Sequence, residues 1–171
     1  TSKALGKDLS LANTFSDGIV LQRGKPINVW GHTGPDQPVT LNFGEETKTT
    51  KANSKGQWSM KIGPLMASSE PRTMAINSGD SELSIADILV GEVWVCGGQS
   101  NMAWTMRGST NADIEISAAN FPEIRFLKLP NVASPREQND FPIGKPTDWI
   151  GKWQRAVSPE VQNCSAVAYY F

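Results

Sequence analysis

Residues 91–102 read Gly-Glu-Val-Trp-Val-Cys-Gly-Gly-Gln-Ser-Asn-Met, and this stretch decides how the second half of the chain is expected to fold. An apolar run over 88–95 predicts a buried strand that ends in two glycines, and 102–106 predicts a helix start. Ser100 lies between them. A strand, a sharp glycine turn and a helix start form the geometry that lifts a nucleophilic serine above a sheet edge. Unpaired N–H groups at the helix start would then stabilise the negative oxygen of an acyl-transfer intermediate.

Ser100 also has a purely structural interpretation, because serine is a favoured residue at the N-cap of a helix. The surrounding pentapeptide over 98–102, Gly-Gln-Ser-Asn-Met, departs from the Gly-x-Ser-x-Gly pattern expected at the nucleophile turn of an α/β-hydrolase. On this pentapeptide alone, a capping serine and a nucleophilic serine are both open interpretations.

The pentapeptide closely resembles the first motif block of the SGNH (GDSL-like) hydrolases, and the longer string over 91–102 resembles the sialate O-acetylesterase branch of that superfamily. Further stretches similar to this family lie at 15–23, 26–31, 56–58, 124–126, 148–149 and 165–171. The similarity therefore covers most of the chain from Phe15 onward. It implies hydrolysis of an acetyl ester on a sugar hydroxyl, with no metal and no organic cofactor.

The resemblance assigns Ser100 as the nucleophile and its backbone N–H as a donor to the oxyanion. The flanking residues Gln99 and Asn101 are candidate substrate-binding residues, as are two residues further along the chain. Trp104 offers an aromatic face on which a sugar ring stacks. Arg107 carries a guanidinium group that suits the carboxylate of a sialic acid.

The catalytic machinery implied by the resemblance is incomplete in this chain. A serine needs an adjacent base to take its proton, and histidine is the usual one. The single histidine, His32, lies in a predicted loop of the first half and matches no catalytic position of the family. We therefore expect the Gly and Asn oxyanion donors, the Asp and the His to come from a missing carboxyl-terminal segment or a second chain.

Short β-prone runs fill the first half of the chain. Candidate strands lie at 26–30, 39–43, 58–62 and 74–76, and candidate turns lie at 34–36, 53–56 and 77–80. This spacing predicts an all-β sandwich or jelly-roll-like module over 1–86. The order changes over 87–171 to a strand, the serine turn, a helix at 112–119, a strand at 124–127 and a final helix from Ser165. That order predicts the start of a parallel, helix-covered sheet. The resemblance implies that it is the first, incomplete part of an SGNH-type α/β domain with a flavodoxin-like parallel sheet.

Composition narrows the class of partner. The net charge is −1, with 16 basic and 17 acidic residues scattered along the chain, which argues against nucleic-acid binding. No apolar run approaches the roughly 18 residues needed for a membrane span. Cys96, in the apolar run, is predicted to be a buried, inert thiol, and a disulfide to Cys164 stays open.

The sequence thus favours the amino-terminal part of a carbohydrate O-acetylesterase that acts on acetylated sialic acid or a related sugar. The resemblance implies a secreted, periplasmic or lysosomal enzyme. Two alternatives remain. One is an acetylesterase for a polysaccharide such as acetylated xylan, because the pentapeptide also occurs in related carbohydrate esterases. The other is a non-catalytic glycan-binding β-module in which the serine turn is vestigial.

Overall fold

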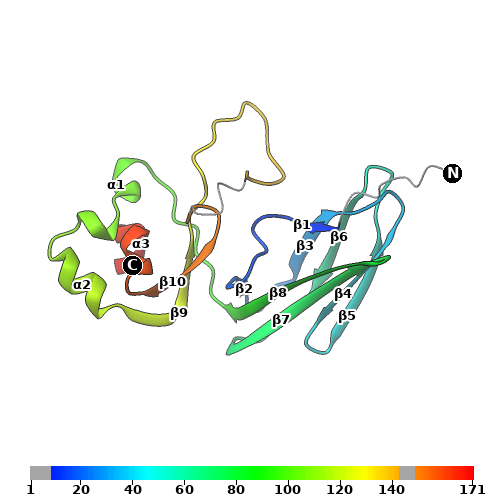
Figure 1. Cartoon of the computed structure of the whole chain (residues 1–171), viewed down its shortest axis with the longest axis horizontal. Helices are drawn as coiled ribbons and strands as arrows, with labels where there is room; N and C mark the ends of the chain where they lie inside the picture. The colour runs from blue at the N-terminus through cyan, green and yellow to red at the C-terminus, as the bar shows by residue number, and fades with distance from the viewer. Residues whose placement is uncertain (1–8, 143–148) are drawn as a thin grey trace. The chain divides into compact units, whose positions relative to one another are not determined.

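The computed structural model describes residues 9–142 and 149–171 (Figure 1). The chain divides after Glu92 into two compact units, each of which is described by itself. The domain boundary predicted after residue 86 falls inside strand β8 (Ser81–Gly91). The assignment of the two parts to a β-sandwich and a catalytic domain stays a prediction.

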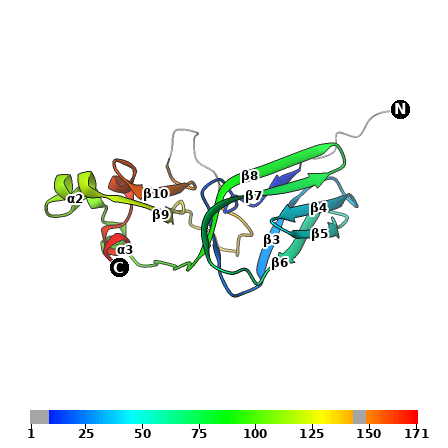
Figure 2. The same cartoon turned by 90° about the horizontal axis from the view of Figure 1, so that it is seen from below.

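The first unit contains two β-sheets (Figure 2). The five-stranded sheet has the order β2–β8–β7–β4–β5, formed with β8 by β2 (Val20–Gln22), β7 (Ser68–Ser78), β4 (Pro38–Phe43) and β5 (Glu46–Lys51). The three-stranded sheet has the order β1–β3–β6, formed by β1 (Ser10–Leu11), β3 (Ile27–His32) and β6 (Gln57–Ile62). Only β2 and β8 pair in parallel, so the larger sheet is mixed. The predicted β-rich first half is confirmed as mostly antiparallel sheet.

Alternating apolar residues explain why the predicted strands form. In β4, Val39, Leu41 and Phe43 are buried and the residues between them are less so, because successive side chains of a strand point to opposite faces. Ile62 of β6 and Met74 of β7 are fully buried in the same unit. All four strands expected from this pattern are present.

Strand β5 was not predicted, because its sequence, Glu-Thr-Lys-Thr-Thr-Lys over 46–51, has no apolar alternation. It forms through backbone pairing with β4, in the register Pro38↔Lys51 to Phe43↔Glu46. The strand lies at the edge of the sheet and most of its residues are exposed. Charged side chains on an edge strand discourage pairing with another molecule. The polar sequence that made this strand hard to predict therefore suits its position at the edge.

The predicted turn at 53–56 contains a glycine that its neighbours require. The Asn53 side chain accepts hydrogen bonds from the N–H groups of Lys55 and Gln57, at 2.9 and 3.0 Å. Gly56 has φ +79°, and a Cβ atom there would collide with the carbonyl oxygen of Thr33. The Thr33 N–H in turn donates to the Gly56 carbonyl at 2.8 Å. Conformation and space therefore both select glycine at this position.

Gly56→Ala is expected to lower the free energy of unfolding by about 3 kcal/mol, because left-handed strain adds to a backbone collision. Gly24→Ala is the matched control, since Gly24 also has a positive φ of +69° but would place its Cβ in open space. The control should lose only about 1 kcal/mol. Urea unfolding followed by tryptophan fluorescence measures both values. Equal losses would mean that the Thr33 backbone yields without cost.

The described residues of the second unit form short helices and one pair of strands. In chain order these are α1 (Ser100–Ala103), the 3-10 helix η1 (Met106–Gly108), α2 (Ala112–Ala118), β9 (Asn120–Leu127), β10 (Trp153–Val157), the 3-10 helix η2 (Glu160–Asn163) and α3 (Ala166–Tyr170). Its core consists of Met106, Ala119, Ala156, Val161, Cys164 and Ala166, with Ile116, Phe126 and Tyr169 packed against them. The helix predicted at 112–119, the strand at 124–127 and the final helix are confirmed.

Two fold predictions for this unit need correction. The strand predicted over 88–95 ends at Gly91, as part of β8, and 92–98 form no strand. The described residues of this unit also form no parallel sheet, because β9 pairs with β10 in antiparallel register from Leu127↔Trp153 to Asn120↔Val157. A parallel neighbour needs a crossover, usually helical, and the described part of the β9–β10 connection contains no helix.

Candidate active site

The candidate nucleophile lies where a helix begins. Ser100 is the first residue of the four-residue helix α1, after the N-cap residue Gln99. The turn is closed by two backbone hydrogen bonds, from the Ala103 N–H to the Gln99 carbonyl at 3.1 Å and from the Trp104 N–H to the Asn101 carbonyl at 3.2 Å. A helix therefore starts at the serine, but the helix start predicted over 102–106 is corrected to 100–103, because Trp104 and Thr105 are extended. Neither Gly97 nor Gly98 has a positive φ.

The three polar residues of the turn, Gln99, Ser100 and Asn101, are all exposed. In the part of the chain that the structure describes, no side chain hydrogen-bonds the Ser100 hydroxyl. The sequence of 93–171 contains no histidine, and His32 is exposed at the end of β3 in the first unit. The second unit thus presents a free hydroxyl and supplies no histidine to activate it.

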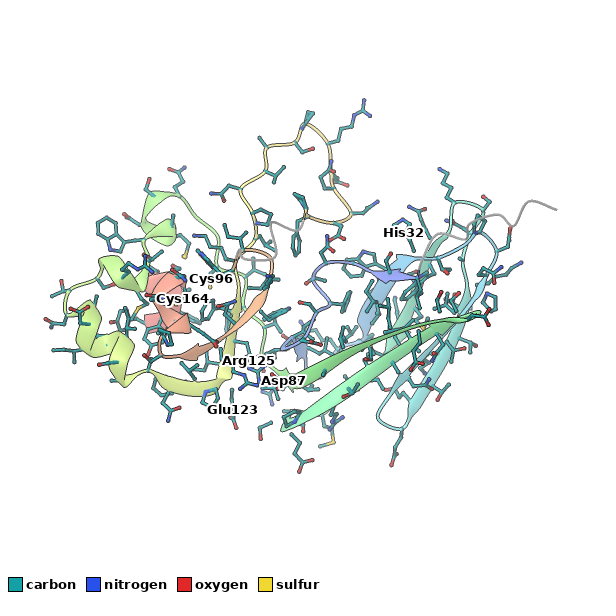
Figure 3. All side chains as sticks on the ribbon, in the orientation of Figure 1. His32, Asp87, Cys96, Glu123, Arg125 and Cys164 are labelled. Atoms are coloured by element: carbon teal, nitrogen blue, oxygen red, sulfur yellow. The ribbon has the colours of Figure 1, made fainter. Side chains whose placement is uncertain are left out.

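The segment before the turn corrects one prediction. Cys96 is exposed, not buried, because β8 ends at Gly91 and residues 92–98 form no strand (Figure 3). Its neighbours Trp94 and Val95 are 68% and 96% exposed. Cys164 is buried, and burial raises the pKa of its thiol to about 11. Both cysteines are free thiols, so no disulfide joins them.

The two larger candidate substrate-binding residues follow α1 directly. Trp104 is the C-cap residue of α1, and its side chain is 59% exposed. The indole lies over Gly108, where an added Cβ would come within 2.9 Å of the Trp104 Nε1 atom. Arg107, in η1, donates from Nη2 to the Asn163 side-chain oxygen at 3.4 Å. Both side chains are therefore partly held by their neighbours and still open to solvent.

A shallow, mostly apolar hollow of about 630 Å³ lies beside α1. It is lined by Cys96, Met102, Ser109, Thr110, Ala166, Val167, Ala168, Tyr170 and Phe171. The ring of Phe171, one of the lining residues, meets the ring of Trp94 edge to face, with centroids 5.1 Å apart. This hollow could not be predicted from the sequence, because it is lined by two segments that are about 55 to 75 positions apart and no local pattern marks such a contact.

The described residues hold neither a metal-binding cluster nor a helix that could span a membrane. Within 9–142 and 149–171, no group of three or more His, Cys, Asp or Glu residues is arranged to hold a metal ion. Among the same residues, no helix has the length and apolar character that crossing a membrane requires.

Comparisons with known proteins place this geometry in context. No protein-family model matches the chain. The sialate O-acetylesterases of Mus musculus and Homo sapiens are each 29% identical to it, over 150 and 149 residues. The matches cover 81% of this chain but 28% of each relative. The sialate O-acetylesterase of Rattus norvegicus is 31% identical over 139 residues, which is 75% of this chain and 26% of that protein.

A solved structure extends the similarity to the fold. The crystal structure of a carbohydrate acetylesterase from Xanthomonas citri superposes with a TM-score of 0.87 at 30% sequence identity. The match covers 95% of this chain and 35% of that one. The chain thus spans roughly a quarter to a third of the length of the relatives that it matches.

Proposed function

From its relationship to the sialate O-acetylesterases and to a carbohydrate acetylesterase, we propose that this chain is the nucleophile-bearing part of a serine carbohydrate O-acetylesterase. One observation carries the proposal. Ser100, in the motif that suggested the family, is exposed at the first residue of a helix, with its hydroxyl open to an incoming ester. The matched fold over 95% of the chain supports it.

The proposed reaction is acyl transfer in two steps. The Ser100 oxygen attacks the acetyl carbonyl and its proton passes to a base, so that a tetrahedral oxyanion forms. The N–H of Ser100 is among those that a helix start leaves without an intrahelical partner, which suits it to stabilise that oxyanion. The sugar hydroxyl leaves with the proton. Water then attacks the acetyl-serine, releases acetate and restores the serine.

In the proposed enzyme, the remaining catalytic groups lie outside the described residues. The second unit supplies no histidine base, and the matched relatives are three to four times longer than this chain's matched part. We therefore place the Asp and His of the site, and the Gly and Asn oxyanion donors, on a further segment or a second chain. Binding to that segment would complete the proposed α/β domain.

The exposed segment before Ser100 is the part that the added segment would cover. Val93, Trp94 and Val95 are apolar and exposed, and successive residues of an extended chain point to opposite faces. An added segment that packs against these side chains would remove their apolar surface from water.

Two side chains bear on the choice of substrate. Trp104 would stack on a sugar ring, and Arg107 would pair with the carboxylate that sialic acid has and xylan lacks. The carboxylate contact favours an O-acetylated sialic acid over an acetylated polysaccharide. Glycans with these modifications occur outside the cytoplasm, so we expect a secreted, periplasmic or lysosomal enzyme.

A substrate panel tests this proposal. We expect the complete protein to release acetate from O-acetylated sialic acid with a kcat/KM at least about tenfold above that for acetylated xylan oligosaccharides. Arg107→Gln should raise KM for the sialic acid substrate about tenfold and leave the xylan value unchanged, because only the first has a carboxylate to lose. Preference for xylan would support the polysaccharide alternative. Glycan binding without acetate release would support a non-catalytic module.

A further inference from the structure

Helix α1 has little that holds it in place by itself. It has four residues, its N-cap makes no side-chain hydrogen bond, and none of its residues is fully buried. A helix this short is not stable in isolation, because too few hydrogen bonds form to offset the conformational entropy lost in its first turn. The position of Ser100 therefore depends on contacts between α1 and other elements.

Met102 makes the first of these contacts. It is half-buried, and its Cβ lies 3.1 Å from where a Cβ on Gly98 would be, so it packs against the turn that precedes Ser100. Residues two apart on a helix point about 200° from each other. Met102 consequently faces inward while Ser100 faces solvent.

The second contact comes from Ser165, the N-cap residue of α3, which lies beside α1 (Figure 1). The Ser165 hydroxyl accepts a hydrogen bond from the Ala168 N–H at 3.3 Å and donates its own proton to the Met102 sulfur at 3.3 Å. Both hydrogen-bonding roles of the hydroxyl are thus used, one in capping α3 and the other in holding α1.

Backbone hydrogen bonds also join residues 104–106, which follow α1, to residues 164–166, where α3 begins. We call this set of contacts the junction. The Ala166 N–H donates to the Trp104 carbonyl at 2.8 Å, and the Met106 N–H donates to the Cys164 carbonyl at 3.1 Å. Thr105 and Ser165 form the antiparallel bridge between them. The exit of α1 and the start of α3 are therefore tied together over three residues on each side.

We propose that Ser165 and Met102 are a pair of positioning residues that sets the orientation of the Ser100 hydroxyl. The inference rests on the proposed function, since it assigns Ser100 as the nucleophile. The backbone bridge fixes where α1 ends, and the contact between the Ser165 hydroxyl and the Met102 sulfur fixes its rotation about its own axis. Loss of that contact leaves α1 attached at its exit but free to turn.

Three single variants of the complete enzyme separate this role from simple capping. Ser165→Asp keeps a capping acceptor for Ala168 but removes the donor to sulfur, Met102→Leu keeps an apolar side chain but removes the acceptor, and Ser165→Thr keeps both roles. We expect the first two to lower kcat about fivefold, the size of one lost hydrogen bond, with KM unchanged. Ser165→Thr should match the wild type. The double variant Ser165→Asp/Met102→Leu should be no worse than either single variant.

The outcomes distinguish this proposal from the proposed function. Unchanged kcat in both single variants, or losses that multiply in the double variant, overturns the positioning pair while Ser100→Ala still abolishes turnover. If Ser100→Ala is active, the proposed function fails, and hydrogen exchange at the Ala103 and Trp104 amides then decides the pair alone. Faster exchange in Ser165→Asp than in Ser165→Thr supports the junction, and equal exchange overturns it.

Discussion

Ser100→Ala is expected to lower kcat of the complete enzyme by about 10⁴-fold or more, with no change in melting temperature. The loss is large because no acetyl-enzyme forms without the hydroxyl, and the remaining rate comes only from substrate binding and oxyanion contacts. The stability is unaffected because Ser100 is exposed and its removal opens no cavity. Acetate release from an O-acetylated sugar and a thermal melt measure the two quantities.

Ser109→Ala is the matched control for this variant. Ser109 lines the neighbouring hollow, is half-buried and has the same side chain, but it has no place in the proposed reaction. Its kcat should stay within about twofold of the wild type. A fluorophosphonate should add its mass to the peptide that contains Ser100 in the wild type and in Ser109→Ala. A Ser100→Ala enzyme that keeps most of the wild-type rate excludes Ser100 as nucleophile.

Parts of the fold that follow from a local residue pattern could be predicted from the sequence, and parts that depend on pairing or packing between distant segments could not. The buried strands of the first unit were predictable because alternation in 39–43 and 58–62 is local and follows directly from the pleat of a strand. Strand β5 was not, because an edge strand is held by backbone pairing and needs no apolar face. The burial predicted for Cys96 failed because β8 ends at Gly91: the apolar residues 88–90 are buried in the sheet, whereas Cys96 lies beyond its end and is exposed.

The candidate site likewise has a part that could be predicted from the sequence and a part that could not. The motif over 98–102 placed a helix start beside the serine, because a helix start is a property of adjacent residues, but the helix covers 100–103 and not 102–106. The contact between Met102 and Ser165 joins residues 63 positions apart, and so it has no local pattern. Chemistry that resides in one segment is visible in a sequence, whereas the packing that orients it requires the structure.

Residues 1–171 alone are expected to hydrolyse p-nitrophenyl acetate at least about 10³-fold more slowly than the complete enzyme. An unassisted serine hydroxyl is a poor nucleophile at neutral pH, and the only histidine of this sequence, His32, is in β3 of the first unit. The residual rate should be the same in Ser100→Ala and in His32→Gln, because neither residue is working as part of a catalytic pair.

The exposed side chains predict a second property of the same preparation. Trp94 and Phe171, whose rings are in contact, are 68% and 80% exposed, and Val95 next to Trp94 is 96% exposed, which is unusual for large apolar groups. Residues 1–171 alone should therefore bind the dye ANS, and the complete enzyme should bind much less. Turnover at the rate of the complete enzyme, from a sample whose intact mass is that of this chain, would show that its own residues activate Ser100. The proposed requirement for an added segment would then be wrong, and the base would have to be sought among His32 and the carboxylates of this chain.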